Sequence, residues 1–322
     1  MYVLGIETSC DETGAAVVKD GRSVLSNIVS SSLKFHQKYG GIIPEIAFRM
    51  QLETITGVAD CALKDAGIKL KEIKLISVTA EPGLLGSLLV GMSFARSVQL
   101  ALNIPVLEVN HLYSHIYANF LNAKPIPLPF VALIVSGGHT SLFYLNGFNR
   151  ITLLGSTQDD ACGEAFDKVA KILGLGYPGG PFIERLSQKG NPKKIIFKCS
   201  QTKEPLNFSF SGIKTAVLYY AKKHLGQKKD YRLTCDIAAA FQEAAIDALI
   251  RKSLLACRLK KAKRLVIGGG VAVNNRLRQK FIQKAKEEGL KIYFPSRDLC
   301  LDNAAMVAGL GYRLFREVRY GN

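Results

Sequence analysis

Apolar residues recur along the chain in two patterns, which together predict an α/β protein. Short apolar runs bounded by polar turns predict strands, at residues 2–6, 14–18, 75–79, 104–109, 129–135, 141–145 and 265–267. Longer segments with helical periodicity predict helices at 44–66 and 86–102, after residue 274, and from about residue 302 to 318. The 44–66 segment has a proline at its start and a glycine after its end, both typical of helix boundaries.

Three loops rich in glycine, hydroxyl or acidic residues follow predicted strands, at residues 7–13, 136–140 and 268–274. The first two lie between paired strands, so the same strand–turn–strand plan occurs twice. Glycines let a backbone approach a ligand closely, and a helix that starts after such a loop favours an anion. We therefore expect a duplicated, two-lobed α/β fold of the actin-like (ASKHA) type, with a nucleotide and metal cleft between the lobes.

A histidine pair follows the strand predicted at 104–109. Asn110 can cap a helix there, and His111 and His115, four residues apart, then share one helical face. Two imidazoles at this spacing can bind one divalent metal, although one ring can instead pack while the other faces solvent. Asp302, where the last helix begins, is suited either to a helix cap or to a metal ligand.

Composition predicts an ordinary globular protein. The chain has 322 residues, of which 48% are hydrophobic and 21% charged, enough to bury a sizeable core. No run of about eighteen apolar residues occurs, so we expect no membrane span, and the N-terminus does not read as a signal peptide. The seven cysteines are scattered without a C-x-x-C pair, which indicates free thiols in a reducing compartment.

Positive charge is concentrated in the second half of the chain. Residues 1–150 hold 12 Lys/Arg and 11 Asp/Glu, whereas residues 151–322 hold 31 and 15, so the second half carries +16 of the net +17. This asymmetry favours a polyanionic partner over a merely basic surface. We expect one lobe at 1–108 with 303–322, and a second lobe at 109–302 that carries the metal site, the adenylate site and the basic face.

The segment between the second and third loops places several charged side chains at helical spacing. Asp160, Glu164, Asp167 and Lys168 are three or four residues apart. Asp167 can hydrogen-bond ribose hydroxyls or belong to a solvated helix face, and for Asp159 the solvated face is favoured.

Taken in order, these motifs resemble one family. They are residues 5–13, the His111/His115 pair, and residues 136–140, 163–168, 177–181, 208–212, 269–274 and 302–304. The chain resembles the TsaD family of tRNA threonylcarbamoyladenosine transferases from residue 2 to about residue 316. That resemblance implies an actin-like fold. It also implies transfer of a threonylcarbamoyl group from threonylcarbamoyl-AMP to N6 of the adenosine just 3′ of the anticodon, in tRNAs that read codons beginning with A.

The resemblance also implies roles for individual residues. It implies that His111, His115 and Asp302 bind one iron or zinc ion. The expected substrate-binding residues are Ile134, Val135, Ser136, Gly137, Gly138, Asp167, Gly180, Glu184 and Asn274. Asp11, Glu12 and His139 are the expected phosphate, metal or proton-transfer groups. The implied partners are tRNA, a TsaB-like paralogue and a TsaE-like ATPase, in a cytoplasmic hetero-oligomer.

The chemistry of the reaction fits these residue types. The exocyclic amine of adenine is a poor nucleophile, so the acyl donor must be activated. A metal held by two imidazoles and a carboxylate keeps open positions for a phosphate or carbonyl oxygen. Either Asp11 or Glu12 can accept the amine proton, and the sequence does not choose between them.

Three other functions remain as alternatives. A small-molecule kinase or ATPase has the same fold and needs no histidine pair. A metalloprotease of the zincin type needs Glu directly after its first histidine, where this chain has Leu112. A non-catalytic scaffold such as TsaB does not need an intact set of metal ligands.

Three positions depart from the family pattern. Glu81 replaces a glycine of a Gly-Pro-Gly turn, which puts the local backbone or partner surface in doubt. Glu184 stands where many members have Asp, so a ribose contact there is longer or lost. Leu301 replaces a common threonine. None of the three is a metal ligand.

Overall fold

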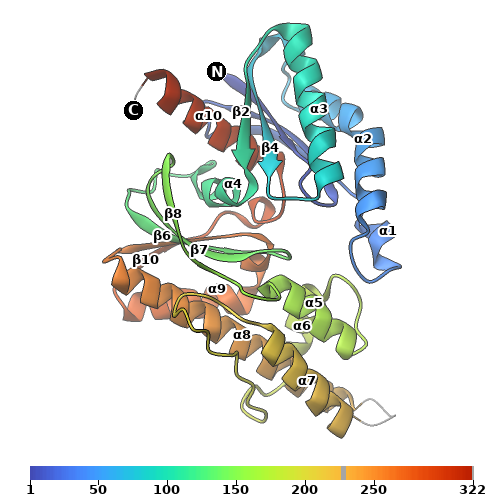
Figure 1. The fold of residues 1–322 in the computed structure, drawn as a ribbon, viewed down its shortest axis with the longest axis vertical. Helices are drawn as coiled ribbons and strands as arrows, with labels where there is room; N and C mark the ends of the chain where they lie inside the picture. The colour runs from blue at the N-terminus through green and yellow to red at the C-terminus, as the bar shows by residue number, and fades with distance from the viewer. Residues whose placement is uncertain (226–229, 321–322) are drawn as a thin grey trace. The chain divides into compact units, whose positions relative to one another are not determined.

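The structure, a computed structural model, describes residues 1–225 and 230–320 (Figure 1). The chain divides into two compact units. Unit 1 comprises Met1–Pro127 and Pro295–Asn322, and unit 2 comprises Leu128–Phe294. The boundaries therefore differ from the expected ones at 108/109 and 302/303, and both histidines and Asp302 belong to unit 1.

Unit 1 is built on a five-stranded sheet in the order β3-β2-β1-β4-β5. The strands are β1 (Tyr2–Glu7), β2 (Glu12–Lys19), β3 (Ser23–Ser31), β4 (Ile73–Glu81) and β5 (Val106–Asn110). β1 pairs antiparallel with β2 and parallel with β4, and β5 runs parallel to β4. The three parallel strands therefore end at the same edge of the sheet.

Helices cover both faces of this sheet. They are α1 (Leu33–Gln37), α2 (Pro44–Asp65), η1 (Leu70–Glu72), α3 (Leu85–Leu102), α4 (His111–Tyr117), η2 (Ala118–Phe120), η4 (Arg297–Leu299) and α10 (Ala304–Tyr320). Leu4 and Ile6 of β1 pack in one core with α2 and α3, which lie side by side (Figure 1). Gly5, between them, faces the opposite way. A Cβ on Gly5 would overlap the carbonyl oxygen of Ala304, so this glycine lets the start of α10 lie directly on the sheet.

Helix α3 is long and apolar enough to cross a membrane by length and composition alone. A single such helix is weak evidence for a membrane, because core helices pass the same test. Its residues Leu88, Val90 and Ala95 are buried in unit 1, whereas Leu89 and Leu100 are exposed. The helix therefore packs one side within unit 1 and presents leucines on its outer side.

Unit 2 repeats the sheet of unit 1, with strands in the order β10-β9-β6-β7-β8. They are β6 (Phe130–Val135), β7 (Thr140–Gly147), β8 (Arg150–Ser156), β9 (Arg264–Gly268) and β10 (Lys291–Tyr293). β6 pairs antiparallel with β7 and parallel with β9, as β1 does with β2 and β4. The expected duplication of an α/β unit is therefore confirmed.

The helices of unit 2 are α5 (Cys162–Ile172), α6 (Gly179–Ser187), α7 (Ser211–His224), α8 (Tyr231–Leu259), η3 (Gly270–Val273) and α9 (Asn275–Glu287). Helix α8 has 29 residues, and most of its apolar side chains are buried. The basic run at 251–264 thus comprises the end of α8, a turn and the start of β9. Another basic run, at 222–232, includes residues 226–229, which lie outside the described residues.

Candidate metal site and glycine loops

Parallel strands bring the residues of the candidate metal site to one edge of the unit 1 sheet. Glu7 ends β1, Asn110 ends β5, and α4 begins at His111. The Asn110 side-chain oxygen accepts hydrogen bonds from the backbone amides of Leu112 and Tyr113, at 2.9 and 3.2 Å. The predicted helix cap is therefore confirmed, and it fixes where the two histidines leave the sheet edge.

Three potential metal ligands converge at this edge. Asp302 Oδ1 lies 3.0 Å from His115 Nε2 and 3.6 Å from His111 Nε2. One ligand atom from each of these residues lies within 4.8 Å of the others. Asn303 caps α10, because its side-chain oxygen accepts the Met306 amide at 3.1 Å. Asp302 lies just before this helix and contacts both histidines.

Glu7 contacts Nδ1 of His111, the ring nitrogen that does not point toward Asp302. Glu7 was not among the site residues predicted from the sequence. Glu7 is 1% exposed, and its Oε2 lies 3.0 Å from His111 Nδ1. The same oxygen accepts the Thr79 hydroxyl at 2.7 Å, and Oε1 accepts the Ser9 amide at 2.6 Å. A carboxylate on the outer nitrogen orients a ligating imidazole. It leaves Nε2 of His111 directed toward Asp302.

Charges at this site depend strongly on one another. Burial disfavours a charged His111 ring, but the carboxylates of Glu7 and Asp302 outweigh it and raise the pKa of His111 to about 9. Burial also opposes ionisation of Glu7, yet His111 holds the pKa of that carboxyl below its usual value. Two imidazoles and one carboxylate in a buried setting are a donor set that suits zinc or iron. The three residues therefore fit a divalent metal.

Asp11 and Glu12 lie close to the same cluster. Burial, followed by the charges of Asp302 and Asp11, raises the pKa of Glu12 well above its ordinary value. Such an environment favours the neutral form of this carboxyl. Asp11 hydrogen-bonds Glu12, so the two carboxyl groups lie side by side.

In unit 2 the glycine loops also meet at one sheet edge. β6 and β9 are parallel neighbours, so the turn after Val135 and the loop after Gly268 emerge together. The amides of Gly163 and Glu164 donate to the carbonyls of Ser136 and Gly137, both at 3.1 Å. This turn therefore lies against the start of α5 and occupies two of its first backbone amides.

The turn residues that are expected to bind substrate can contact a ligand through main-chain groups rather than through side chains. Ile134 and Val135 are fully buried in β6, so only their main-chain groups can meet a ligand. A Cβ on Gly137, Gly138 or Gly180 would contact no atom within 4 Å. These glycines thus leave open room beside the chain.

The remaining expected residues of unit 2 hold the ends of helices. Asp167 Oδ1 accepts the Gly179 amide at 2.6 Å. Burial raises the pKa of Asp167, against the opposing effect of the Gly179 and Gly180 amides. Asn274 caps α9 through the Leu277 amide at 2.9 Å. These contacts already occupy part of the hydrogen-bonding capacity of both side chains.

Two more acidic side chains have structural partners. Glu184 Oε1 accepts both the backbone and side-chain amide groups of Asn275, at 2.7 and 2.9 Å. Asp159 accepts the backbone amides of Phe210 and Ser211, at 2.8 and 3.2 Å. Asp159 is exposed, as expected, but it precedes α5 rather than lying on a helix face, and it anchors the start of α7.

Each unit holds a different part of the expected site. Asp11, Glu12, His111, His115 and Asp302 belong to unit 1. His139 and the nine expected substrate-binding residues belong to unit 2. The His139 amide lies 3.2 Å from Ser136 Oγ, which keeps the turn compact.

Sequence comparisons match almost the whole chain. The TsaD family, described as tRNA N6-adenosine threonylcarbamoyltransferase, matches residues 23–309. A protein of that description from Syntrophus aciditrophicus is 48% identical over 317 residues, covering 98% of this chain and 93% of its own. Another, from Caldicellulosiruptor saccharolyticus, is 47% identical over 312 residues, covering 97% and 92%.

Solved structures share the fold at low sequence identity. Full-length HypF in a phosphate- and nucleotide-bound form aligns with a TM-score of 0.64 at 14% identity, covering 99% of this chain and 56% of HypF. ROK hexokinase from Thermus thermophilus aligns with a TM-score of 0.54 at 16% identity, covering 99% of each chain. Together with the repeated strand order, they support the expected two-lobed, actin-like fold.

Proposed function

The chain belongs to the family of tRNA N6-adenosine threonylcarbamoyltransferases, and from this premise we propose how its residues carry out the transfer. The donor is threonylcarbamoyl-AMP, and the acceptor is N6 of the adenosine just 3′ of the anticodon in tRNAs that read codons beginning with A. The convergence of His111, His115 and Asp302 supports this proposal most strongly. The small-molecule kinase alternative has no need of these ligands.

The three ligands hold one iron or zinc ion. When bound, such an ion acts as a Lewis acid that polarises a carbonyl or phosphoryl oxygen and stabilises developing negative charge. Glu7 keeps the His111 ring in the orientation that presents Nε2. Both imidazole rings are buried, whereas the Asp302 side chain is partly exposed.

The open glycines of unit 2 bind the adenylate. Gly137 and Gly138 let main-chain groups approach the donor closely. Asn274, Asp167 and Glu184 then act mainly by holding the ends of α9 and α6 in place, since their side chains already engage backbone amides. A fixed donor removes much of the entropic cost of reaction.

Proton transfer is the task of Asp11 and Glu12. The adenine amine must lose a proton as its nitrogen forms the new bond to the carbonyl carbon and AMP leaves. Burial and the neighbouring carboxylates disfavour the charged form of Glu12, so once ionised this carboxylate is a stronger base than an exposed one. In its ionised form Glu12 accepts the proton, with Asp11 as its hydrogen-bond partner, and His139 lies in the adenylate-binding turn.

Nucleoside analysis of tRNA tests this function directly. The protein is incubated with unmodified tRNA, ATP, threonine, bicarbonate and the family's helper proteins, and the tRNA nucleosides are then analysed by mass. We expect threonylcarbamoyladenosine at the position 3′ of the anticodon. Its absence, together with phosphorylation of a small metabolite without tRNA, would support the kinase alternative instead.

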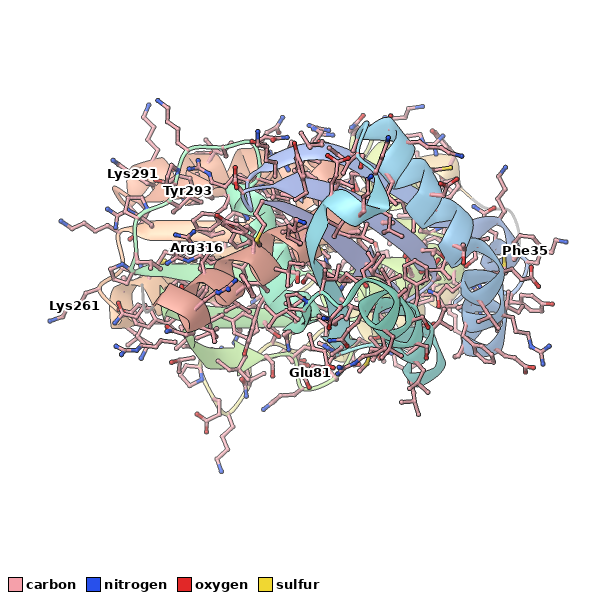
Figure 2. All side chains as sticks on the ribbon, turned by 90° about the horizontal axis from the view of Figure 1, so that it is seen from above. Phe35, Glu81, Lys261, Lys291, Tyr293 and Arg316 are labelled. Atoms are coloured by element: carbon pink, nitrogen blue, oxygen red, sulfur yellow. The ribbon has the colours of Figure 1, made fainter. Side chains whose placement is uncertain are left out.

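A basic edge on unit 2 suits the phosphate backbone of tRNA. It consists of the exposed residues Lys260, Lys261, Lys263 and Lys291. The Lys291 amide donates to the Lys263 carbonyl at 3.0 Å, so two of these lysines are adjacent. None of the four pairs with an acid among the described residues. Figure 2 shows Lys261 and Lys291 extending outward.

The basic edge lies at the amino ends of β9 and β10, away from the glycine loops at the carboxyl ends of β6 and β9. A long polyanion is needed to use both. With six phosphate contacts, the slope of log K against log salt is roughly −4 to −5. Lys263→Glu with Lys291→Glu should flatten this slope, whereas Lys284→Ala, which removes a lysine paired with Glu287, should leave it unchanged.

The partner proteins complete the proposal. A TsaB-like paralogue and a TsaE-like ATPase form a cytoplasmic hetero-oligomer with this chain. The exposed Leu85, Leu89 and Leu100 of α3 offer an apolar surface for such a partner. Light scattering of a mixture with the purified paralogue measures assembly, and Leu89→Lys should weaken it.

A further inference from the structure

The loop that carries Asp11 and Glu12 is held in place by hydrogen bonds to its backbone carbonyls. All five consecutive carbonyls from Thr8 to Glu12 accept hydrogen bonds from other parts of unit 1. The donors are Gln51 Nε2 to Thr8, Cys10 and Glu12, the Leu84 amide to Ser9, Ser87 Oγ to Cys10, and Ser32 Oγ to Asp11. The loop therefore has little freedom to move its acidic side chains.

Gln51 is the donor that reaches several of these carbonyls. Its Nε2 lies 3.0 Å from the Cys10 carbonyl and 2.9 Å from the Glu12 carbonyl, with Thr8 further away at 3.5 Å. An amide nitrogen has two hydrogens, which match the two short contacts. The three carbonyls also fix the orientation of the Gln51 amide. If the amide were flipped, its oxygen would face three carbonyl oxygens, which cannot donate a hydrogen bond.

The other end of the Gln51 amide argues against a purely stabilising role. Gln51 is 1% exposed, and its Oε1 has no hydrogen-bond partner among the described residues. A buried acceptor without a partner costs about 1 to 3 kcal/mol. That cost offsets much of what its donated hydrogen bonds contribute, so the amide does little for net stability. Its specific effect is on the loop.

Glu12 of this loop lies near the metal ligand Asp302. Asp11 and Glu12 hydrogen-bond each other, and the charge of Asp302 acts on Glu12. Gln51 belongs to α2, which packs against β2 and β3. It thus connects a long, well-packed helix to the backbone behind the acidic pair.

We propose that Gln51 is a positioning residue for the transfer reaction. It holds the carbonyls of Cys10 and Glu12, and thereby fixes the carboxyl groups of Asp11 and Glu12 beside the metal ligands. This inference rests on the proposed catalytic role of that acidic pair. A misplaced base of this kind slows the chemical step without weakening metal or tRNA binding.

Gln51→Met tests the inference, because it keeps the length of the side chain and removes the donor. We expect the single-turnover transfer rate to fall by roughly 10- to 100-fold, with tRNA KM, metal content and melting temperature close to wild type. Thr54→Val is the matched control. It removes hydrogen bonds of the same helix with the Met50 carbonyl and the Thr13 hydroxyl, but none with the carbonyls of residues 8–12, and should keep the rate within about twofold.

A double-mutant cycle separates this inference from the proposed function. If Gln51 acts through the acidic pair, Gln51→Met should add little to the loss already caused by Glu12→Gln. Independent, multiplying losses would overturn the positioning role and leave the role of Glu12 intact. Wild-type rates in both Asp11→Asn and Glu12→Gln would overturn the proposed base and this inference together. A wild-type rate in Gln51→Met alone would overturn only the inference.

Discussion

The two units share one strand order but surround a buried acidic side chain in different ways. In unit 2, Asp160 is paired with cations of the chain and contacts Lys168 and Lys214 at 2.5 and 2.7 Å. In unit 1, Glu7 and Asp302 contact the imidazoles of His111 and His115 instead. The same sheet edge is therefore balanced by lysines in one unit and is short of positive charge in the other.

The pKa directions show the same contrast. Burial opposes ionisation of Asp160, but hydrogen bonds from Lys168 and Lys214 outweigh it and lower its pKa. For Glu12, burial and the nearby carboxylates act together to raise the pKa. A divalent cation would supply the charge that unit 1 lacks. Unit 1 therefore provides side chains that can bind a metal, whereas unit 2 provides main-chain groups and open room beside its glycines.

The largest expected effect comes from removing a ligand of unit 1. His111→Ala should lose the bound metal and slow transfer by roughly a thousandfold, because several kcal/mol of charge stabilisation disappear. Elemental analysis of the purified protein and nucleoside analysis measure the two losses. His224→Ala, which removes an imidazole of unit 2 outside the ligand group, should change neither. Full metal content in His111→Ala would mean that unit 1 is not the metal unit.

A smaller effect is expected from changing Glu7, which contacts the ligand His111 but is not itself a proposed ligand. Glu7→Gln keeps the shape of the side chain but removes the negative charge on His111 Nδ1. We expect metal affinity to fall by about 10- to 100-fold, measured by competition with a chelator. An unchanged affinity would show that the carboxylate of Glu7 serves only to hold the turn after β1.

Local sequence patterns predicted the parts of the site that lie close together in the chain. Asn110 as a cap and the histidine pair one turn apart follow from helix geometry. The loops after β6 and β9 follow from glycine content after apolar strands. The strand–turn–strand repeat was enough to predict the duplicated fold.

Contacts between distant segments could not be predicted in this way. Glu7 and His111 are 104 positions apart, and His115 and Asp302 are 187 apart. For Asp302 the sequence left capping and ligation open, and only the position of α10 on β1 decides between them. Neither Glu7 nor Gln51 carries a local signal beyond polarity beside a buried strand or within an amphipathic helix.

The next prediction compares alanine substitutions at two glycines of unit 2, Gly269 and Gly137. Gly269 has φ +90° and a Cβ there would overlap the Val135 carbonyl oxygen, whereas Gly137 has open space. Gly269→Ala should destabilise the protein by about 1 to 3 kcal/mol. Gly137→Ala should change stability by less than about 0.5 kcal/mol and instead raise the KM for the adenylate.

Urea unfolding and donor kinetics distinguish these outcomes. Both variants should keep their metal, since the ligands belong to unit 1. Loss of metal in either variant would contradict the assignment of metal binding to unit 1 alone. An unchanged donor KM in Gly137→Ala would remove the turn after β6 from the adenylate site.

The smallest effect is a pH dependence confined to the lysine-paired acid of unit 2. The pKa of Asp160 is lowered from its ordinary value of 3.8, so the folded state binds its proton less readily than the unfolded state. Its stabilising contribution is therefore complete well above that value and is lost as the pH falls through the folded-state pKa. The difference in unfolding free energy between wild type and Asp160→Asn should stay constant from about pH 7 to pH 5 and shrink below about pH 4. A difference that does not shrink in acid would mean that Asp160 stabilises unit 2 by shape alone, and the contrast in charge balance between the units would then lose its clearest example.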